Sequence, residues 1–138
     1  MSRNARHSST LNAIPAQNTS TALASPQRTS ARDVARFLQS SRQEGGRLYG
    51  LLKAQQVNDR LPKGLPAGTP IAHKTGDRIH WAHDAGVITT PSGDVLLAVL
   101  SGPWAAPCCD ADHPGAGERV AFGAIADLGG RVYALYHR

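Results

Sequence analysis

Residues 95–100 read VLLAVL, an unbroken apolar run that constrains the fold more than any other part of the chain. Successive side chains of a β-strand point to opposite faces, so a strand made of this run would be apolar on both faces. Such a strand is tolerated where it is central in a sheet that is covered on both sides. The run therefore predicts a covered sheet with further strands along its far edge.

Two segments before this run complete a predicted antiparallel meander. Residues 71–75 and 83–90 are short and bounded by turn residues, which is typical of strands. Residues 91–94 read PSGD, a tight-turn signal that would join the second segment to the apolar run. The sequence therefore predicts a sheet of three consecutive antiparallel strands.

Two helices are predicted before the strands. The first begins at Ser30, which with Asp33 resembles a capping box, and ends near residue 42. Gly45-Gly46 breaks it, and the second helix continues to about residue 56. The turn residues Asn58-Asp59 and then Pro62 end this second helix. Their apolar faces consist of Val34, Phe37 and Leu38 in the first helix and of Leu48, Leu51 and Leu52 in the second.

The segments around the strands are predicted from their prolines, glycines and apolar spacing. Residues 61–70 hold three prolines and two glycines, which favour an ordered connector over a helix or strand. A helix is predicted at the C-terminus, although Gly129 and Gly130 each cost it about 1 kcal/mol relative to alanine. Its predicted apolar face consists of Ile125, Leu128, Val132, Leu135 and Tyr136.

Size and charge exclude several classes of protein. A chain of 138 residues fits one ordinary domain, and residues 1–29, which are polar and without periodicity, are predicted to be mostly irregular. The net charge of +5 is spread along the chain with no nucleic-acid-binding motif, so no nucleic-acid partner is expected. No segment is apolar enough for a membrane span or an export signal, so no membrane partner is expected either.

Residues 52–77 read LKAQQVNDRLPKGLPAGTPIAHKTGD and are followed by HDAGV at residues 83–87. With the predicted C-terminal helix, this stretch resembles the class A β-lactamases and the related penicillin-binding-protein-like serine hydrolases, whose motif set includes K-T-G. The resemblance covers the chain from about residue 6 to residue 137, roughly the second half of a family member. It implies a partial β-lactamase/transpeptidase-like fold of the α/β (α+β) class, in which residues 30–138 form the C-terminal part of the domain.

The resemblance also implies roles for four consecutive residues. Lys74 would attract the substrate carboxylate and assist proton movement, and Thr75 would bind that carboxylate. Gly76 would let the substrate approach the backbone, and the backbone N–H of Asp77 would be one of two oxyanion-hole donors. An ammonium with an adjacent hydroxyl suits a carboxylate ligand, and a preorganised N–H stabilises a developing oxyanion. The implied substrate is a small molecule with a carboxylate, either a β-lactam or a cell-wall peptide-like amide, and no cofactor or metal is implied.

The N-terminal residues resemble the end of the family's omega loop, R-x-E-x-x-L-N. Arg6, Leu11 and Asn12 keep the spacing of this motif, and Asn12 would help hold the deacylating water. Ser8 stands where the family has the glutamate that activates this water. If this alignment is right, the chain lacks the deacylation base.

The nucleophile of such an enzyme is missing from the sequence. A serine activated by a lysine one helical turn later requires S-x-x-K, but Gly50, Arg60 and Ile71 precede the three lysines at that spacing. The S-D-N motif is missing as well. The apolar run at residues 95–100 also lacks the N-terminal strands that pair beside it in the family. These observations favour a truncated serine hydrolase that is inactive alone, and the alternative is a non-catalytic module that binds carboxylates or cell-wall peptides. The sequence carries no export signal, whereas family members are usually periplasmic or secreted.

Two other groups of residues were weighed as sites. The segment PCCDADH holds Cys108, Cys109, Asp110, Asp112 and His113, but vicinal cysteines do not match zinc spacing, so a surface loop is favoured. His73, His80 and His83 fit packing better than a metal site. Asp84 is predicted to be a structural hydrogen-bond acceptor, since adjacency to His83 is weak evidence for a catalytic triad.

Overall fold

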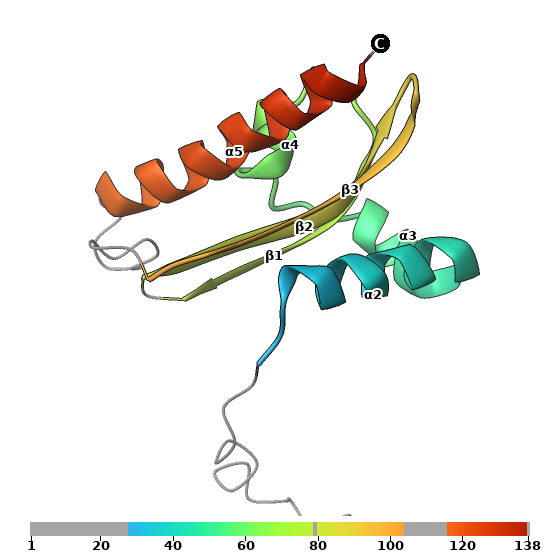
Figure 1. The fold of residues 1–138 in the computed structure, drawn as a ribbon, viewed down its shortest axis with the longest axis horizontal. Helices are drawn as coiled ribbons and strands as arrows, with labels where there is room; N and C mark the ends of the chain where they lie inside the picture. Colours follow the sequence, from blue (N-terminus) through green and yellow to red (C-terminus); the bar gives the residue numbers. More distant parts are fainter. Residues whose placement is uncertain (1–27, 79, 104–115, 138) are drawn as a thin grey trace, which may run out of the picture.

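The computed structural model describes residues 28–78, 80–103 and 116–137. Figure 1 shows a sheet with helices on both faces, α2 and α3 on one side and α4 and α5 on the other. This confirms the predicted fold class, an antiparallel sheet with flanking helices that include a C-terminal helix. The elements in chain order are α2 (Ala31–Glu44), α3 (Gly46–Lys53), α4 (Leu61–Gly64), β1 (Ile71–Arg78), β2 (Trp81–Thr90), β3 (Gly93–Ser101) and α5 (Ala116–Tyr136).

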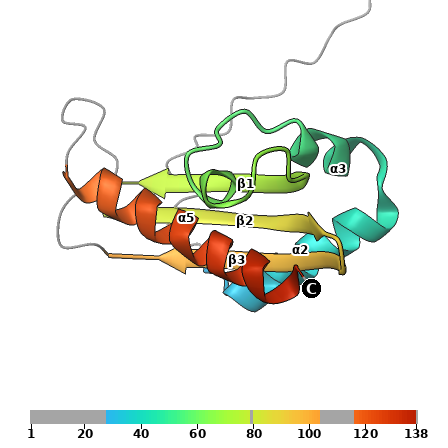
Figure 2. The ribbon, with the colours of Figure 1, turned by 90° about the horizontal axis from the view of Figure 1, so that it is seen from above.

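The sheet is the predicted three-stranded meander, in the order β1-β2-β3. All three strands extend beyond the predicted ranges, and Figure 2 shows them side by side with α5 lying across them. Within the described residues β3 lies at the edge of the sheet, so the strands predicted beyond its far edge are not among them. Its side chains are accordingly half-buried or exposed, whereas β2 holds six fully buried residues in a row of seven from Ala82 to Ile88.

Helix α2 begins where its capping residue predicts. Ser30 is extended, and its hydroxyl oxygen accepts a hydrogen bond from the Asp33 N–H at 3.2 Å. Gly45 and Gly46 follow the helix with φ of 64° and 71°, a backbone conformation that favours glycine. Leu38 is buried, but Phe37 is 54% exposed, so the predicted apolar face is only partly covered by the sheet.

The segment between α3 and β1 differs from its prediction. Helix α3 ends at Lys53 rather than near residue 56, and Leu48 and Leu51 of its predicted apolar face are exposed. The predicted connector contains the short helix α4, and Pro62, which was expected to end a helix, lies in its first turn. Proline is tolerated there because a first-turn N–H has no partner within the helix.

Helix α5 forms as predicted but buries only part of its predicted face. Ile125 is buried, whereas Leu128, Leu135 and Tyr136 are exposed, and small residues make a further contact with α4. A Cβ atom on Gly64 of α4 would lie 1.7 Å from the Ala126 carbonyl oxygen, and one on Gly130 would lie 2.6 Å from the Gly64 oxygen. The unfavourable helix propensity of the glycines is therefore offset by a backbone-to-backbone approach that no other residue permits.

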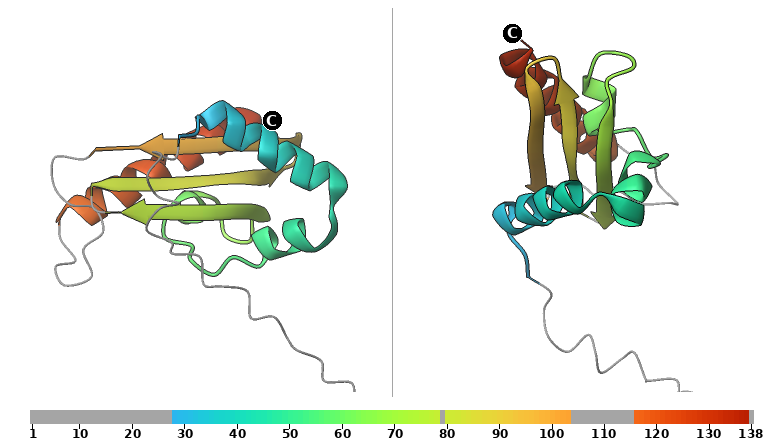
Figure 3. Two further views of the ribbon diagram at one scale, coloured as in Figure 1. Left: turned by 90° about the horizontal axis from the view of Figure 1, so that it is seen from below. Right: turned by 90° about the vertical axis from the view of Figure 1, so that its right-hand side faces the viewer.

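The two faces of the sheet carry separate cores. The left-hand view of Figure 3, seen from below, shows α2 and α3 in front of the strands and α5 behind them. The core under α2 and α3 consists of Leu38, Leu52, Ala72, Ala85 and Val87. The core under α4 and α5 consists of Leu61, Ala82, Ala121 and Ile125. In the part of the chain that the structure describes, no helix is long and apolar enough to cross a membrane.

Candidate functional site

The four residues predicted to bind substrate lie together on the edge strand β1. Lys74 and Gly76 face α2, whereas Thr75 and Asp77 face α4 and α5, because side chains alternate along a strand. Lys74 is exposed, Thr75 is buried, and the Asp77 side chain is about half exposed.

The backbone of β1 presents unpaired groups on its outer edge. The Thr89 N–H donates to the Pro70 carbonyl at 3.0 Å, and the register continues without interruption from Ile71 opposite Ile88. Since hydrogen-bonded and non-bonded pairs alternate in an antiparallel ladder, the N–H and C=O groups of Thr75 and Asp77 point away from β2. The predicted oxyanion donor, the Asp77 N–H, therefore lies on the side of the strand that a ligand can reach.

The Lys74 ammonium lies over the same edge. Its Nζ atom donates to the Thr75 carbonyl oxygen at 2.5 Å, so the side chain turns from its own face of the sheet toward the outer edge. A positive charge and outward N–H groups are thus concentrated on one stretch of strand, an arrangement that suits an anion.

Arg60 joins this edge from outside β1 and was missed by the sequence analysis. Its side chain is only 2% exposed, and its Nη2 atom donates to the Asp77 carboxylate at 2.7 Å. The guanidinium lies over the Phe122 ring of α5, 4.0 Å from the centroid. Its Nε and Nη1 atoms are buried and have no hydrogen-bond partner among the described residues. No local sequence signal distinguishes Arg60 from the other arginines, because its hydrogen bond to Asp77 and its contact with Phe122 are both long-range.

His73 and Asp84 form a second polar cluster, on the face opposite the Lys74 side chain. Asp84 is fully buried and accepts the Leu61 N–H at 3.0 Å, so its prediction as a structural acceptor agrees with the structure. Its other oxygen lies 2.9 Å from His73 Nδ1. His83 lies on the opposite face of β2, where its Nδ1 accepts the Ser101 N–H at 3.1 Å.

His73, His80 and His83 do not come together as a metal site in the described residues. The side chains of His73 and His83 point to opposite faces of the sheet, and His80 lies in the β1–β2 turn with φ of 67°. Within residues 28–78, 80–103 and 116–137, no three His, Cys, Asp or Glu side chains are placed to hold a metal ion. The other predicted positions lie outside the described residues: Arg6, Ser8, Leu11, Asn12, Cys108, Cys109, Asp110, Asp112 and His113.

Of three cavities on the α2 face of the sheet, one of about 730 Å³ is lined by Gly76 and Asp77, and another adjoins Lys74. The latter has a volume of about 390 Å³, and its walls are mostly apolar side chains of α2 and α3: Val34, Phe37, Leu38, Leu48 and Leu52. Phe37 and Leu48, which are exposed despite their apolar spacing, line this cavity, so apolar side chains lie beside the charged strand edge.

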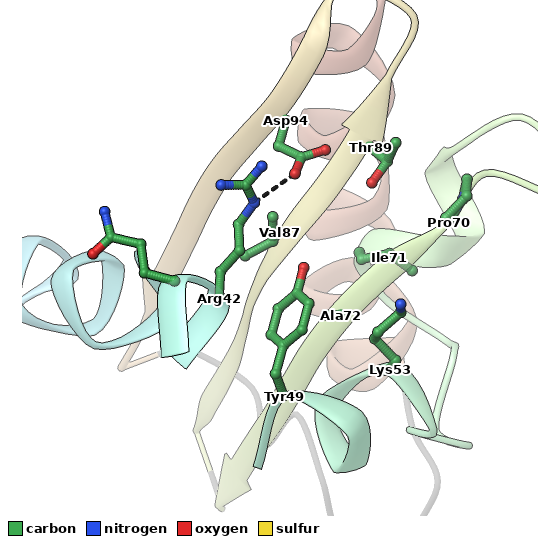
Figure 4. Close-up of a pocket in the computed structure, with 10 residues that line it drawn as sticks. Arg42, Tyr49, Lys53, Pro70, Ile71, Ala72, Val87, Thr89 and Asp94 are labelled. Atoms are coloured by element: carbon green, nitrogen blue, oxygen red, sulfur yellow. Dashed lines mark hydrogen bonds and ion pairs between the residues drawn. The ribbon is translucent and has the colours of Figure 1, made fainter. Parts of the chain in front are cut away.

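The third cavity, drawn in Figure 4, lies at the other end of β1, beside Pro70 and Ile71. Its volume is about 540 Å³. Arg42 lines it but is already paired with Asp94 at 2.5 Å, and Lys53 lies 5.7 Å from the centroid of the Tyr49 ring. None of the residues predicted to bind substrate lines this cavity, so the site is assigned to the Lys74 end of the strand.

Comparison with known proteins gives one family. A sequence profile of the Beta-lactamase enzyme family matches residues 2–133. No curated protein sequence matches the chain significantly. Among solved structures, PBP-A is similar with 26% identity and a TM-score of 0.61 over 78% of this chain and 40% of its own. A PBP-A mutant solved as an acyl-enzyme complex with penicillin G gives the same values.

A β-lactamase from Sphaerobacter thermophilus is also similar, with 26% identity and a TM-score of 0.54, over 75% of this chain and 38% of its own. The chain thus spans about two fifths of the length of the solved structures that it matches.

Proposed function

The chain belongs to the beta-lactamase enzyme family, and on that premise we propose that the outer edge of β1 is the substrate-binding wall of a serine acyl-transfer site. The observation that carries this proposal is the Lys74 ammonium lying over the same strand edge as the outward backbone groups of Thr75 and Asp77. Such an edge binds a ligand as an added strand would, through main-chain hydrogen bonds, and adds a charge for its carboxylate.

Gly76 supports this role because the fold itself does not require a glycine there. A Cβ atom at this position would meet only the His83 ring at 3.7 and 3.8 Å, an ordinary contact distance. By contrast, a Cβ atom on Gly86 of the neighbouring strand would lie 2.7 Å from the His73 Cβ. A glycine without a packing reason at a strand edge is consistent with the close approach of a ligand to the backbone.

The proposed reaction is that of the family: acyl transfer from a β-lactam or peptide-like amide to a serine, and then to water. In this scheme Lys74 attracts the substrate carboxylate and Thr75 helps to bind it. The Asp77 N–H donates to the developing oxyanion, where a single preorganised donor is worth about 3 to 4 kcal/mol of the barrier. The nucleophile has no candidate within the 138 residues, so we propose that this chain alone performs no turnover.

The apolar cavity beside Lys74 supports the need for a further segment. In the proposed enzyme, a segment carrying S-x-x-K covers Val34, Phe37 and Leu48 and brings its serine to the β1 edge. Residues 1–29 would contribute the end of the omega loop, with Asn12 near the deacylating water.

The alternative is a non-catalytic module that uses the same edge to bind a carboxylate or a cell-wall peptide. The presence of K-T-G without S-x-x-K or S-D-N in this sequence favours it. The two functions share the ligand-binding wall and differ in covalent chemistry.

Ligand binding tests whether the outer edge of β1 is the substrate-binding wall. Penicillin G and its methyl ester are titrated by calorimetry against the chain, Lys74→Ala, and Lys53→Ala as the matched control on the third cavity. We expect weak binding of the acid, up to about fivefold weaker binding of the ester, and the same weakening of acid binding in Lys74→Ala but not in Lys53→Ala. Equal binding of acid and ester, or a loss only when Cys108 and Cys109 are both replaced by serine, would remove the assignment.

Turnover and labelling separate the two functions. With a chromogenic cephalosporin, we expect this chain to show no hydrolysis above buffer and no serine adduct by mass spectrometry. The same assay on the product of a reading frame extended upstream to include S-x-x-K should give turnover that depends on Lys74. Binding without turnover in that longer protein would favour the module.

A further inference from the structure

The His73 and Asp84 side chains form a buried pair that the proposed reaction does not use. They are 1% and 0% exposed, and His73 Nδ1 lies 2.9 Å from Asp84 Oδ1. The pair is diagonal across the ladder, since His73 is directly opposite Gly86 and Asp84 is opposite Thr75. Gly86 has no side chain to occupy the space next to the imidazole, because a Cβ atom there would lie 2.9 Å from the Ala72 oxygen.

The hydrogen-bond partners determine where the protons are. Asn58 Nδ2 donates to the Gln56 carbonyl at 3.2 Å, so the Asn58 side-chain oxygen is the atom that faces His73 Nε2 at 3.1 Å. A carbonyl oxygen only accepts, so a hydrogen bond to this atom requires a proton on Nε2. The Nδ1 atom faces a carboxylate whose second oxygen already accepts the Leu61 N–H. A carboxylate also only accepts, so a hydrogen bond to it requires a proton on Nδ1 as well.

The same contacts tie one segment to the strands. We call residues 58–61 the latch segment, since three of its members reach β1 or β2. Asn58 accepts from His73, the Leu61 N–H donates to Asp84, and Arg60 donates to Asp77 at 2.7 Å. The segment thus connects the buried pair to the residue whose N–H is the proposed oxyanion donor.

We propose that His73 and Asp84 are positioning residues: as an imidazolium–carboxylate pair they hold the latch segment closed, and the latch segment sets Asp77 at the β1 edge through Arg60. The inference rests on the proposed function only for what Asp77 does, and the latch itself is independent of any ligand. If either ring nitrogen lost its proton, a lone pair would face an acceptor oxygen, and the contact with Asn58 or Asp84 would become repulsive.

The charged groups around the pair agree with its protonation. Besides Asp84 of β2, the charged residues of the latch segment are Asp59 and Arg60, and Arg60 is paired with Asp77 at 2.7 Å and with Asp59 at 3.7 Å. The Lys74 ammonium lies at the outer edge of the sheet, bonded to the Thr75 oxygen. The Asp84 carboxylate is therefore the counter-ion of the imidazolium.

The test uses nuclear magnetic resonance of the chain labelled with nitrogen-15, without ligand. At neutral pH, we expect the His73 ring to show two slowly exchanging N–H protons and the nitrogen shifts of an imidazolium. Asp84→Asn should remove the Nδ1 proton, because an asparagine amide can then donate to that nitrogen. Asn58→Ala should speed exchange of the Leu61 amide at least tenfold and shift the Asp77 amide signal.

Asp94→Asn is the matched control, because it also removes a carboxylate that pairs with a cation but lies at the other end of the sheet, against Arg42. It should leave the His73 ring and the Leu61 amide unchanged. A single ring N–H in the unmodified chain overturns the proposal, as does an Asn58→Ala variant with unchanged Leu61 and Asp77 signals. If Asp84→Asn does not fold, exchange measured by mass spectrometry on Asn58→Ala decides in its place.

The outcome is separable from that of the proposed function. A closed latch in a chain that binds no penicillin would support the latch and contradict the binding wall. An open or absent latch in a chain whose binding depends on Lys74 would do the reverse.

Discussion

The two edges of the sheet are built in opposite ways. The outer edge of β1 carries Lys74 and the outward backbone of Thr75 and Asp77, and Arg60 contacts it from the side. The outer edge of β3 is apolar: by the same alternation, the backbone groups of Leu96, Ala98 and Leu100 point away from β2. No strand pairs with them within the described residues, and Leu100 is 37% exposed.

The difference shows that the side chains of an edge strand indicate what the edge binds. The β1 edge is polar, and the side chains of Asp77 and His73 hold the strand in place through hydrogen bonds to residues 58–60. The β3 edge has the apolar composition of a central strand, and an unpaired apolar edge is a site of aggregation. We therefore expect β3 to take a further strand, as the family resemblance implies, and β1 to take a ligand.

The largest expected effect on stability is that of proline substitution in β3, which tests the alternating direction of the backbone N–H groups. Val99 directs its N–H toward β2 and Ala98 directs its N–H outward. Val99→Pro should destabilise the chain by about 3 kcal/mol or more, whereas Ala98→Pro should cost within about 1 kcal/mol because edge positions tolerate proline. Urea unfolding followed by circular dichroism measures both, and equal costs would show that the assigned alternation is wrong.

The next largest effect is expected from alanine substitution of two glycines on neighbouring strands, Gly86 and Gly76. Gly86→Ala should lower the free energy of unfolding by about 1 to 3 kcal/mol, because its Cβ would overlap His73 and the Ala72 backbone. Gly76→Ala should change stability by less than about 0.5 kcal/mol, as an uncrowded surface position does. The same change should abolish penicillin binding. A Gly76→Ala chain that is stable and still binds would remove the close-approach role.

Self-association should come from β3 alone. The purified chain should form oligomers in analytical ultracentrifugation, and Leu100→Lys should weaken this association at least tenfold, about 1.4 kcal/mol, by placing a charge on the edge. The control is Val120→Lys, an apolar residue on α5 that is more exposed than Leu100, 60% against 37%. A monomer with a concentration-independent thermal transition would show that the fold closes without further strands.

The smallest effect is expected in the salt dependence of ligand binding at β1. In an edge that is open to solvent, the Lys74 contact with a carboxylate should contribute about 0 to 1 kcal/mol, and it should fade between low salt and about 0.5 M salt. Titration of penicillin G at several salt concentrations measures this. Binding that is independent of salt would mean that the contact is shielded or that Lys74 is not its origin.

Local signals predicted the parts of the molecule that depend on local chemistry. The Ser30 cap, the Gly45-Gly46 break and the 91–94 turn each act within a few residues, so helix α2 and the β2–β3 connection were predicted from sequence. The K-T-G stretch was placed on a strand for the same reason. The assignment of its residues as a binding wall stays a prediction.

Sequence patterns could not predict the contacts between residues that are far apart in the chain. Arg60 and Asp77 are 17 positions apart and His73 and Asp84 are 11 apart, so nothing in their spacing marks them as partners. Apolar periodicity also identifies an apolar face without saying what covers it, which is why Phe37 and Leu128 were expected in the core and are exposed.

The glycine contact between α4 and α5 has a practical consequence for measurement. Because backbone touches backbone there, with no side chain between Gly64 and Ala126, the two helices cannot slide or tilt without a clash, and they should behave as one rigid body. Spin labels on the exposed side chains of Lys63 and Asp127 would then keep a constant separation. That pair would serve as an internal ruler, against which a third label on β1 reports whether the edge moves when a ligand arrives.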